Sequence, residues 1–234
     1  MCSSDLETPL GLMYGAYRPA DEAHTHWRLA QLVVPFWVIP PAAMLADQIM
    51  IKGYIPMDDT HTMVITIQRK GVVTPSTTRE GKPVPGLGVN FAPRNEFLPN
   101  TTDWFGRWRI PNNAENDWLI DRAAQRSGGV FSGITGLNVQ DNAVGGMLGP
   151  ISDRTREFLT QSDIMIVRAR RKLLQLVERL GADKSVALPG VDDPSVYRRH
   201  RAGNFIAPSD KPFREAYTDM MRTHAKTEPV WTEG

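Results

Sequence analysis

Two short segments in which apolar and polar residues alternate constrain the fold of this chain most strongly. Residues 49–55, IMIKGYI, and residues 63–68, MVITIQ, both place isoleucine or methionine at most alternate positions. This period of two is typical of a strand that turns one face toward a core. The link between them, PMDDTHT, is rich in the Pro, Asp and Thr residues that favour turns. The sequence therefore predicts an antiparallel hairpin.

The second half of the chain carries helical patterns instead. Residues 117–126, DWLIDRAAQR, predict a short helix that ends at the Gly-Gly pair that follows. A longer helix is predicted from Asp163, which can cap the first turn, to Leu180, with Gly181 as the stop signal. The apolar stripe of this helix, by which we expect it to pack, consists of Val167, Leu174 and Val177.

The connections between these elements are irregular. Residues 71–113 contain eleven glycines and prolines and little periodicity, and such a segment is uncommon in a compact domain unless it covers a site or meets a partner. After residue 182 the chain is again rich in proline, glycine and charge, and we expect an extended tail that packs on the body. Strands first and helices later predict an α+β domain built on an antiparallel sheet.

Composition excludes several classes of protein. Apolar residues make up 41% and charged residues 23%, which is ordinary for a globular domain, and a net charge of +1 provides no field that attracts nucleic acid or an anionic membrane. The single cysteine, Cys2, excludes a disulfide framework or a cysteine-ligated cluster within this chain and fits a reducing, cytoplasmic compartment. Residues 29–46 are uncharged but contain three prolines, which predicts a bent, buried segment rather than a membrane span.

The first six residues are unusual. MCSSDL is what the bases GTG-TGC-TCT-TCC-GAT-CT encode if GTG is the start codon, and that string resembles a common sequencing adapter. We therefore expect Met1–Leu6 to be a non-native start, with the gene continuing upstream. The alternative is a native, loosely ordered terminus.

The histidines do not form a known ligand pattern in the sequence. His24 and His26 could share one face of a strand, but we favour surface histidines, because no carboxylate accompanies them in a recognised ligand spacing. The run from Asp58 to His61 allows a metal site, yet a turn in which an aspartate side chain binds its own backbone explains the same residues. The sequence contains no phosphate-binding glycine loop and no nucleophile elbow.

Asp141 is the carboxylate that most needs an explanation. It lies in GLNVQDNAVGGMLGPISDR, among residues such as Val139, Ala143 and Val144 that resemble a core. A buried acid is costly unless it is paired or bound to a cation. Asp141 could cap a helix or pair with Arg154; alternatively, it has a metal-binding or catalytic role and faces a cavity.

Long stretches of the chain resemble one enzyme family. ETPLGLMYGAYRP, PMDDTHT, DWLIDRAAQRSGGVFSGITGLNVQDNAV and GPISDRTREFLTQSDIMIVRARRKLL are similar to the C-terminal part of the catalytic domain of Rieske non-haem iron oxygenases. The similarity is to the oxygenase (alpha) subunits of the phthalate-dioxygenase-like branch. It covers residues 7–182, which would be the catalytic-domain part, and leaves residues 183–234 as a C-terminal extension that packs on the domain.

The resemblance implies a metal site of which this chain holds one ligand. The family binds a mononuclear Fe(II) through two histidines and one carboxylate, which leaves positions for O2. Its carboxylate lies in the Gln-Asp dipeptide that corresponds to Gln140-Asp141, so Asp141 is the candidate ligand. The paired histidines, and the Cys and His ligands of the 2Fe-2S cluster in the Rieske domain, lie upstream of everything present here. One departure from the family is the pair Gly145-Gly146, where relatives usually carry a polar or acidic residue.

The resemblance also implies a fold, a reaction and partners. The fold is a helix-grip (START/Bet v 1-like) antiparallel sheet with helices, here incomplete. The complete enzyme would hydroxylate or O-demethylate a carboxylated aromatic substrate with O2 and electrons from a reductase or ferredoxin. It would assemble as a homotrimer or a multiple of it. A substrate carboxylate could bind Arg69, Arg107, Arg109 or Arg126. The alternatives are a metal-free helix-grip module that binds a small molecule, or an inactive fragment.

Overall fold

The computed structural model describes residues 2–47, 50–70, 82, 97–191, 193–229 and 231, with side chains from residue 6 onward. The chain divides into two compact units. Unit 1 consists of Met1–Val72 and Phe158–Gly234, and unit 2 consists of Val73–Glu157.

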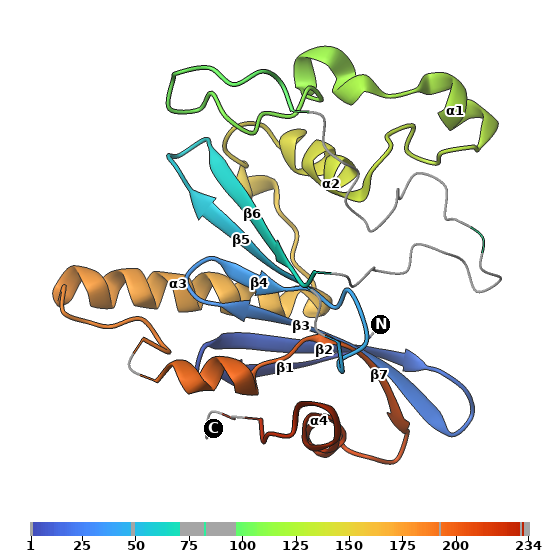
Figure 1. The fold of residues 1–234 in the computed structure, drawn as a ribbon, viewed down its shortest axis with the longest axis vertical. Helices are drawn as coiled ribbons and strands as arrows, with labels where there is room; N and C mark the ends of the chain where they lie inside the picture. The colour runs from blue at the N-terminus through green and yellow to red at the C-terminus, as the bar shows by residue number, and fades with distance from the viewer. Residues whose placement is uncertain are drawn as a thin grey trace. The chain divides into compact units, whose positions relative to one another are not determined.

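Unit 1 is built on an antiparallel sheet, as predicted (Figure 1). Its strands run in the order β1-β2-β3-β4-β5-β6. β7 pairs with residues 24–29 of β3, and β4 pairs with residues 31–33 of the same strand. The strands are β1 (Cys2–Thr8), β2 (Gly11–Pro19), β3 (His24–Val33), β4 (Trp37–Ile39), β5 (Met50–Pro56), β6 (Thr62–Gln68) and β7 (Gly203–Pro208). With the helices below, this arrangement confirms the α+β prediction.

The predicted hairpin is formed by β5 and β6, which pair from Met50↔Gln68 to Pro56↔Thr62. Ile49, the first residue of the predicted segment, lies outside the described residues. In the turn, one Asp58 oxygen accepts the backbone amides of Thr60 (2.8 Å) and His61 (2.7 Å). These bonds, that of Thr60 first, lower the pKa of Asp58. The turn interpretation of this run is therefore confirmed.

One face of the sheet carries the main core of unit 1. Helix α4 (Phe213–Met220) packs there, and Phe205 of β7 and Trp27 of β3 lie opposite each other on the paired strands. Tyr217 of α4 donates its hydroxyl to the carbonyl of Arg201 at 2.9 Å, and Gln31 donates to the same carbonyl at 2.7 Å. Burial raises the pKa of Tyr217 to about 12, so the hydroxyl stays a donor at neutral pH.

These contacts correct the expectation for the C-terminal segment. Residues 183–229 do not form an extended tail, because they supply η5 (Pro194–Arg199), β7, α4 and the π-helical turn η6 (Met221–Ala225). The strand has six residues, of which only Gly203, Phe205 and Ala207 face inward, and it forms by pairing with β3, far away in the sequence. A pattern so short is hidden by the surrounding Pro, Gly and charged residues.

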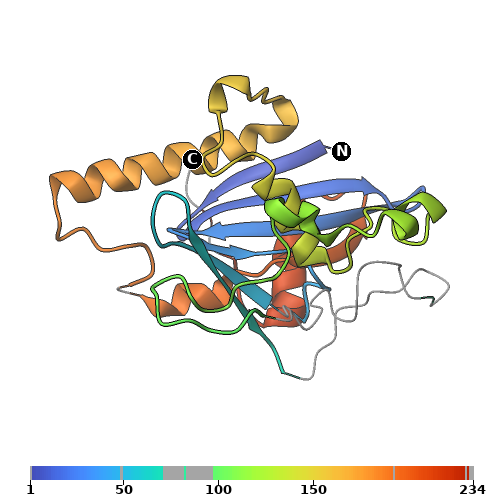
Figure 2. The same cartoon turned by 90° about the horizontal axis from the view of Figure 1, so that it is seen from above.

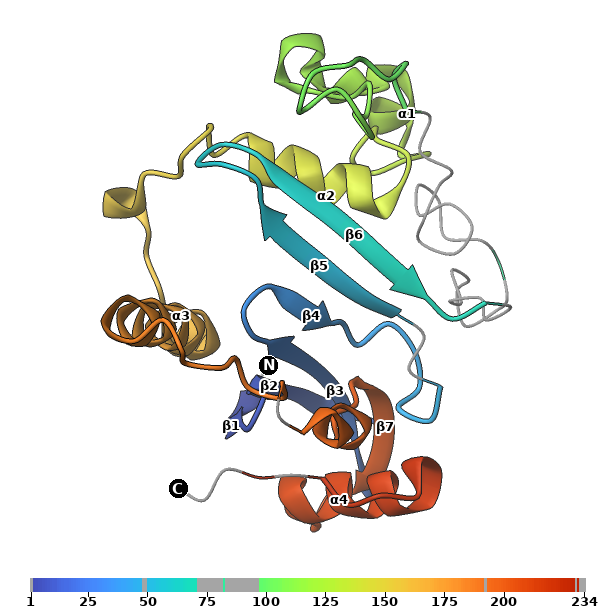
Figure 3. The same ribbon diagram turned by 60° about the vertical axis from the view of Figure 1, so that its left-hand side comes forward.

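The opposite face of the sheet carries helix α3 (Ile164–Ala182) (Figure 3). Lys172 of α3 donates to Glu7 at 3.1 Å, and Glu7 points away from the α4 face because its neighbours Leu6 and Thr8 alternate with it along β1. The helix contacts β2 and its sheet-facing residues, Met165, Ala169, Lys172 and Leu176, are half-buried. The predicted stripe is wrong: Leu174 and Val177 are exposed. Gly181 lies inside the helix, which is capped by Asp183.

The apolar segment from Leu29 to Ala46 is bent and largely inward, as predicted. It leaves β3, turns at a cis Val34–Pro35 bond, forms β4 and ends in an isolated turn. Leu29, Val33, Val34, Ile39 and Leu45 are buried. Within the described part of the chain, no helix combines the length and the apolar character required to cross a membrane.

The described part of unit 2 contains short helices joined by loops, among them η2 (Ala114–Leu119), α1 (Arg122–Ser127), α2 (Leu137–Gly146) and η3 (Arg154–Arg156). The predicted helix 117–126 is split, because Asp117 and Trp118 have positive φ and Asp121 caps a new start by accepting from Ala123 and Ala124. The predicted end is confirmed at Gly128, which adopts φ 75°. Residues 97–113 contain no strand, and residues 71–81 and 83–96 of the predicted irregular segment lie outside the described residues.

Candidate functional site

Asp141 lies in the middle of α2, on its outer side. Val139 and Ala143 are four residues apart and both are buried in the core of unit 2, against Ile134 and the partly buried Trp118 and Ile120. Asp141 is about 200° around the helix from Val139 and is exposed, as is Val144. The acid among apolar neighbours is therefore explained by helical phase, and the expectation that Asp141 faces a cavity is wrong for the unit described by itself.

Both simple structural roles for Asp141 are also wrong. The residue does not cap α2, whose N-cap position is Gly136 with φ 100°. Arg154 pairs with Glu157 at 3.5 Å instead. Among the described residues, none forms a hydrogen bond or ion pair with the Asp141 carboxylate. Its role as an iron ligand stays a prediction.

The residue before Asp141 fixes the start of the helix. Gln140 donates its side-chain amide to the carbonyl of Ile134 at 2.8 Å, which ties the first turn of α2 to the loop that leads into it. In the same loop the hydroxyl oxygen of Ser132 accepts a hydrogen bond from the backbone amide of Ile134 at 3.2 Å. The dipeptide Gln140-Asp141 thus combines a side chain that holds the helix with a carboxylate directed outward. Sequence reasoning missed this role of Gln140, because a polar residue one turn into a helix is not distinctive.

The glycine pair after Asp141 is explained by a close contact. A Cβ atom on Gly146 would lie 2.4 Å from Cζ2 of Trp118, whereas a Cβ atom on Gly145 would meet nothing within 4 Å. The last turn of α2 therefore needs glycine at one position only, where it lets the Trp118 ring approach the helix backbone. The departure from the family at Gly145-Gly146 is compatible with a regular helix through Gly146.

We predict opposite effects for alanine at the two glycines. Gly145→Ala should stabilise α2 by up to ~1 kcal/mol, because alanine is the better helix former and has room. Gly146→Ala should destabilise unit 2 by about 1–3 kcal/mol, because the Trp118 ring must move. Hydrogen-exchange protection of residues 137–146 measures both effects in the same protein. Equal protection in the two variants would contradict the contact.

The histidines of the chain lie at the surface or in the core of unit 1. His24 Nδ1 lies 2.8 Å from Asp21, with about half of each side chain exposed, and Arg18 Nε donates to His26 at 3.3 Å. Partial burial, assisted by Arg18 and Arg28, lowers the pKa of His26. His200 is buried, its Nδ1 lies 2.7 Å from the Val196 carbonyl, and burial lowers its pKa. Among the residues that the structure describes, no three His, Cys, Asp or Glu side chains gather as metal ligands.

The four candidate arginines for a substrate carboxylate are all exposed. Arg69 follows β6 in unit 1 and donates to the carbonyl of Asp47 at 3.3 Å. Arg107 and Arg109 lie in the loop before η2, where Arg109 donates to the carbonyl of Pro99 at 2.9 Å, and Arg126 lies in the last turn of α1. All four remain candidates.

Comparison with known proteins assigns the family. Residues 6–230 match the model of the family described as "LigXa C-terminal domain like". The chain belongs to this family. The match includes β7 and α4, so the segment after residue 182 is part of the family domain.

Curated relatives of this LigXa C-terminal-like domain are oxygenase subunits. The chain is 40% identical over 220 residues to the 3-chlorobenzoate-3,4-dioxygenase oxygenase subunit of Comamonas testosteroni. This alignment covers 92% of the chain and 50% of the relative. It is 29% identical over 181 residues to the phthalate 4,5-dioxygenase oxygenase subunit of Pseudomonas putida. This alignment covers 76% of the chain and 38% of the relative. The predicted family is confirmed, and the chain spans half or less of the length of these relatives.

Proposed function

We propose that this LigXa C-terminal-like domain is the C-terminal part of the oxygenase component of a Rieske-type oxygenase that oxidises an aromatic acid with O2. The observation that carries the proposal is the 40% identity over 92% of the chain to the oxygenase subunit of a 3-chlorobenzoate dioxygenase. A reductase or ferredoxin would supply the electrons, and the complete subunit would assemble as a trimer or a multiple of it in the cytoplasm. Ring hydroxylation and O-demethylation are both compatible with such an enzyme.

Asp141 is the residue that we propose as a ligand of the mononuclear iron. A carboxylate on the outer side of a regular helix, with no described partner, can serve as the one carboxylate of an Fe(II) site that also contains two histidines. The other ligands, two histidines, would come from the upstream part of the subunit, together with the domain that holds the 2Fe-2S cluster. Iron bound by two histidines and one carboxylate keeps positions open for O2. Within this chain Gln140 orients the helix, and a guanidinium can bind the substrate carboxylate bidentately.

The test uses the complete oxygenase subunit encoded at the locus, in which residue 7 onward follows its native upstream sequence. Supplied with Fe(II) and a reductase, it should consume O2 only in the presence of an aromatic acid such as 3-chlorobenzoate or phthalate, and form an oxidised product in proportion. Iron analysis should find one mononuclear iron and one 2Fe-2S cluster per subunit. An upstream sequence without a histidine pair and cluster ligands would refute the proposal, as would O2 uptake independent of any aromatic acid.

A further inference from the structure

Helix α3 is apolar on two sides, and only one of them is packed. Met165, Ala169 and Leu176 face the sheet. On a second side lie Ile166, Leu174 and Val177, whose side chains are 41%, 62% and 67% exposed. An amphipathic helix normally packs its apolar residues against a neighbouring part of the protein. We call Ile166, Leu174 and Val177 the outer stripe. It is a surface of α3 that the described residues leave uncovered.

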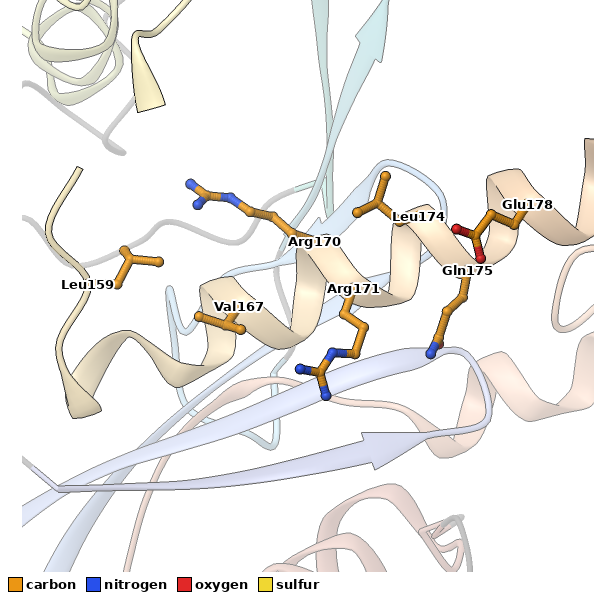
Figure 4. Close-up of a pocket in the computed structure, with 7 residues that line it drawn as sticks. All are labelled: Leu159, Val167, Arg170, Arg171, Leu174, Gln175 and Glu178. Carbon is orange, nitrogen blue, oxygen red and sulfur yellow. The ribbon is translucent and has the colours of Figure 1, made fainter. Parts of the chain in front are cut away.

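An open groove of about 460 Å³ lies beside the outer stripe and shares Leu174 with it (Figure 4). Its apolar lining comes from Leu159, Val167 and Leu174, and its polar lining from Arg170, Arg171, Gln175 and Glu178. In Figure 4, Leu174 and Arg170 leave the helix on one side, and Arg171 and Gln175 leave it on the other. Apolar side chains bordered by charges of both signs fit a polypeptide that presents apolar residues next to charged ones.

The position of β1 indicates which polypeptide this is. β1 is the edge strand of the sheet and has β2 as its neighbour among the described strands. The ion pair between Glu7 and Lys172 joins β1 to α3, and Figure 2 shows β1 directly alongside the helix. Native chain that joins at Glu7, in place of residues 1–6, must therefore arrive next to α3. The Comamonas relative has as much sequence again as the part that matches here, and the family is described as a C-terminal domain.

We infer that the outer stripe of α3 is the docking surface for the upstream half of the same oxygenase subunit. The inference rests on the proposed function, because it requires that such an upstream half exists. Burial of Leu174 and Val177 would remove apolar surface from water and would give α3 the second packed side that its sequence provides. The upstream half would thus complete the domain around α3 as well as supply the missing metal ligands.

Thiol labelling of Leu174→Cys tests the inference, in a Cys2→Ser background for the present chain, whose only cysteine is Cys2, and with the native upstream sequence for the complete subunit. Mass spectrometry of the peptide that carries each new cysteine gives its labelling rate, because the complete subunit would also contain the cysteines that bind the cluster. Arg179→Cys is the matched control, since Arg179 is exposed and lies about 200° around the helix from Val177. In the present chain both thiols should react with maleimide at similar rates. In the complete subunit we expect Leu174→Cys to react at least about tenfold more slowly, while Arg179→Cys keeps its rate.

Three results would overturn the inference. If Leu174→Cys is already protected in the present chain, unit 2 or a second copy covers the stripe, and a dimer seen by light scattering would distinguish the two. Equal slowing of both thiols in the complete subunit would indicate general shielding. A complete subunit that turns over while Leu174→Cys stays fully reactive would refute the docking surface and leave the proposed function intact. Conversely, protection without iron or turnover would support the docking surface and refute the proposed function.

Discussion

Replacing Asp141 by alanine in the complete oxygenase subunit is expected to remove the mononuclear iron and abolish turnover. The carboxylate would be one of three protein ligands, and its loss leaves two imidazoles that cannot hold Fe(II) firmly. Loss of a residue that only supports a ligand costs about 10–100-fold in metal affinity or activity, so loss of the ligand itself should exceed that range. Iron content by elemental analysis and substrate-dependent O2 uptake measure the two effects separately.

Asn142→Ala is the matched control for Asp141→Ala. Both residues are exposed, lie next to each other in α2, and become the same side chain. Neither substitution removes buried surface, and alanine favours helix at both positions, so α2 should keep its hydrogen-exchange protection. Asn142→Ala should keep iron and turnover. A subunit with Asp141→Ala that holds its mononuclear iron and turns over normally would show that Asp141 is not a ligand.

The parts of the fold that could be predicted are those whose signals are local. The β5–β6 hairpin was predictable because the alternation in both strands and the turn residues around Asp58 occur within 20 residues of one another. The end of α1 at Gly128 was predictable for the same reason. In contrast, β7 is stable because Phe205 and Ala207 pack against β3 and α4. The residues of Gly203–Pro208 alone do not indicate that β3 and α4 are their partners.

The errors at α2 and α3 have a common physical origin. The sequence of a helix shows which residues are apolar, but it does not show which side of the helix the rest of the protein covers. Around Asp141, the spacing of Val139 and Ala143 could have revealed that the acid lies on the other side of the helix, whereas the contact of Trp118 with Gly146 depends on a fold that the sequence does not display. On α3, two of the three residues chosen from the sequence, Leu174 and Val177, are exposed, because Met165 and Leu176 face the sheet instead.

The proposed ligand itself was found by a different route. Composition and spacing left Asp141 with several roles, and the resemblance of the surrounding sequence to an oxygenase family singled it out. The structure adds that the side chain points outward from a helix whose start is fixed by Gln140. A metal site assembled from two halves of a subunit cannot be read from one half, since the ligands that complete it are carried elsewhere in the sequence.

Phe205→Ala is expected to destabilise unit 1 by about 3–5 kcal/mol, which is the usual loss when a fully buried phenylalanine is truncated. Phe205 is 0% exposed, its ring stacks near Trp27 with the centroids 6.4 Å apart, and it belongs to the cluster that joins β3 to α4. The cavity left by the ring would open in the core cluster that also contains Leu29 and Tyr217. Leu29 is held by the sheet and Tyr217 by its hydrogen bond to the Arg201 carbonyl, so the core cannot easily close around the cavity. Urea denaturation measures the loss in the free energy of unfolding, and hydrogen exchange of residues 24–33 assigns that loss to this unit.

Ile206→Ala separates the loss of the core from the loss of a strand residue. Ile206 is the next residue in β7, is 55% exposed and points to the other face, so its truncation should cost less than ~1 kcal/mol. A large difference between the two variants follows only if β7 alternates between core and surface as a member of the sheet. If residues 203–208 instead lay as a tail over the domain, both substitutions would have similarly small effects. The comparison therefore tests whether the C-terminal segment is part of the fold that carries the proposed docking surface of α3.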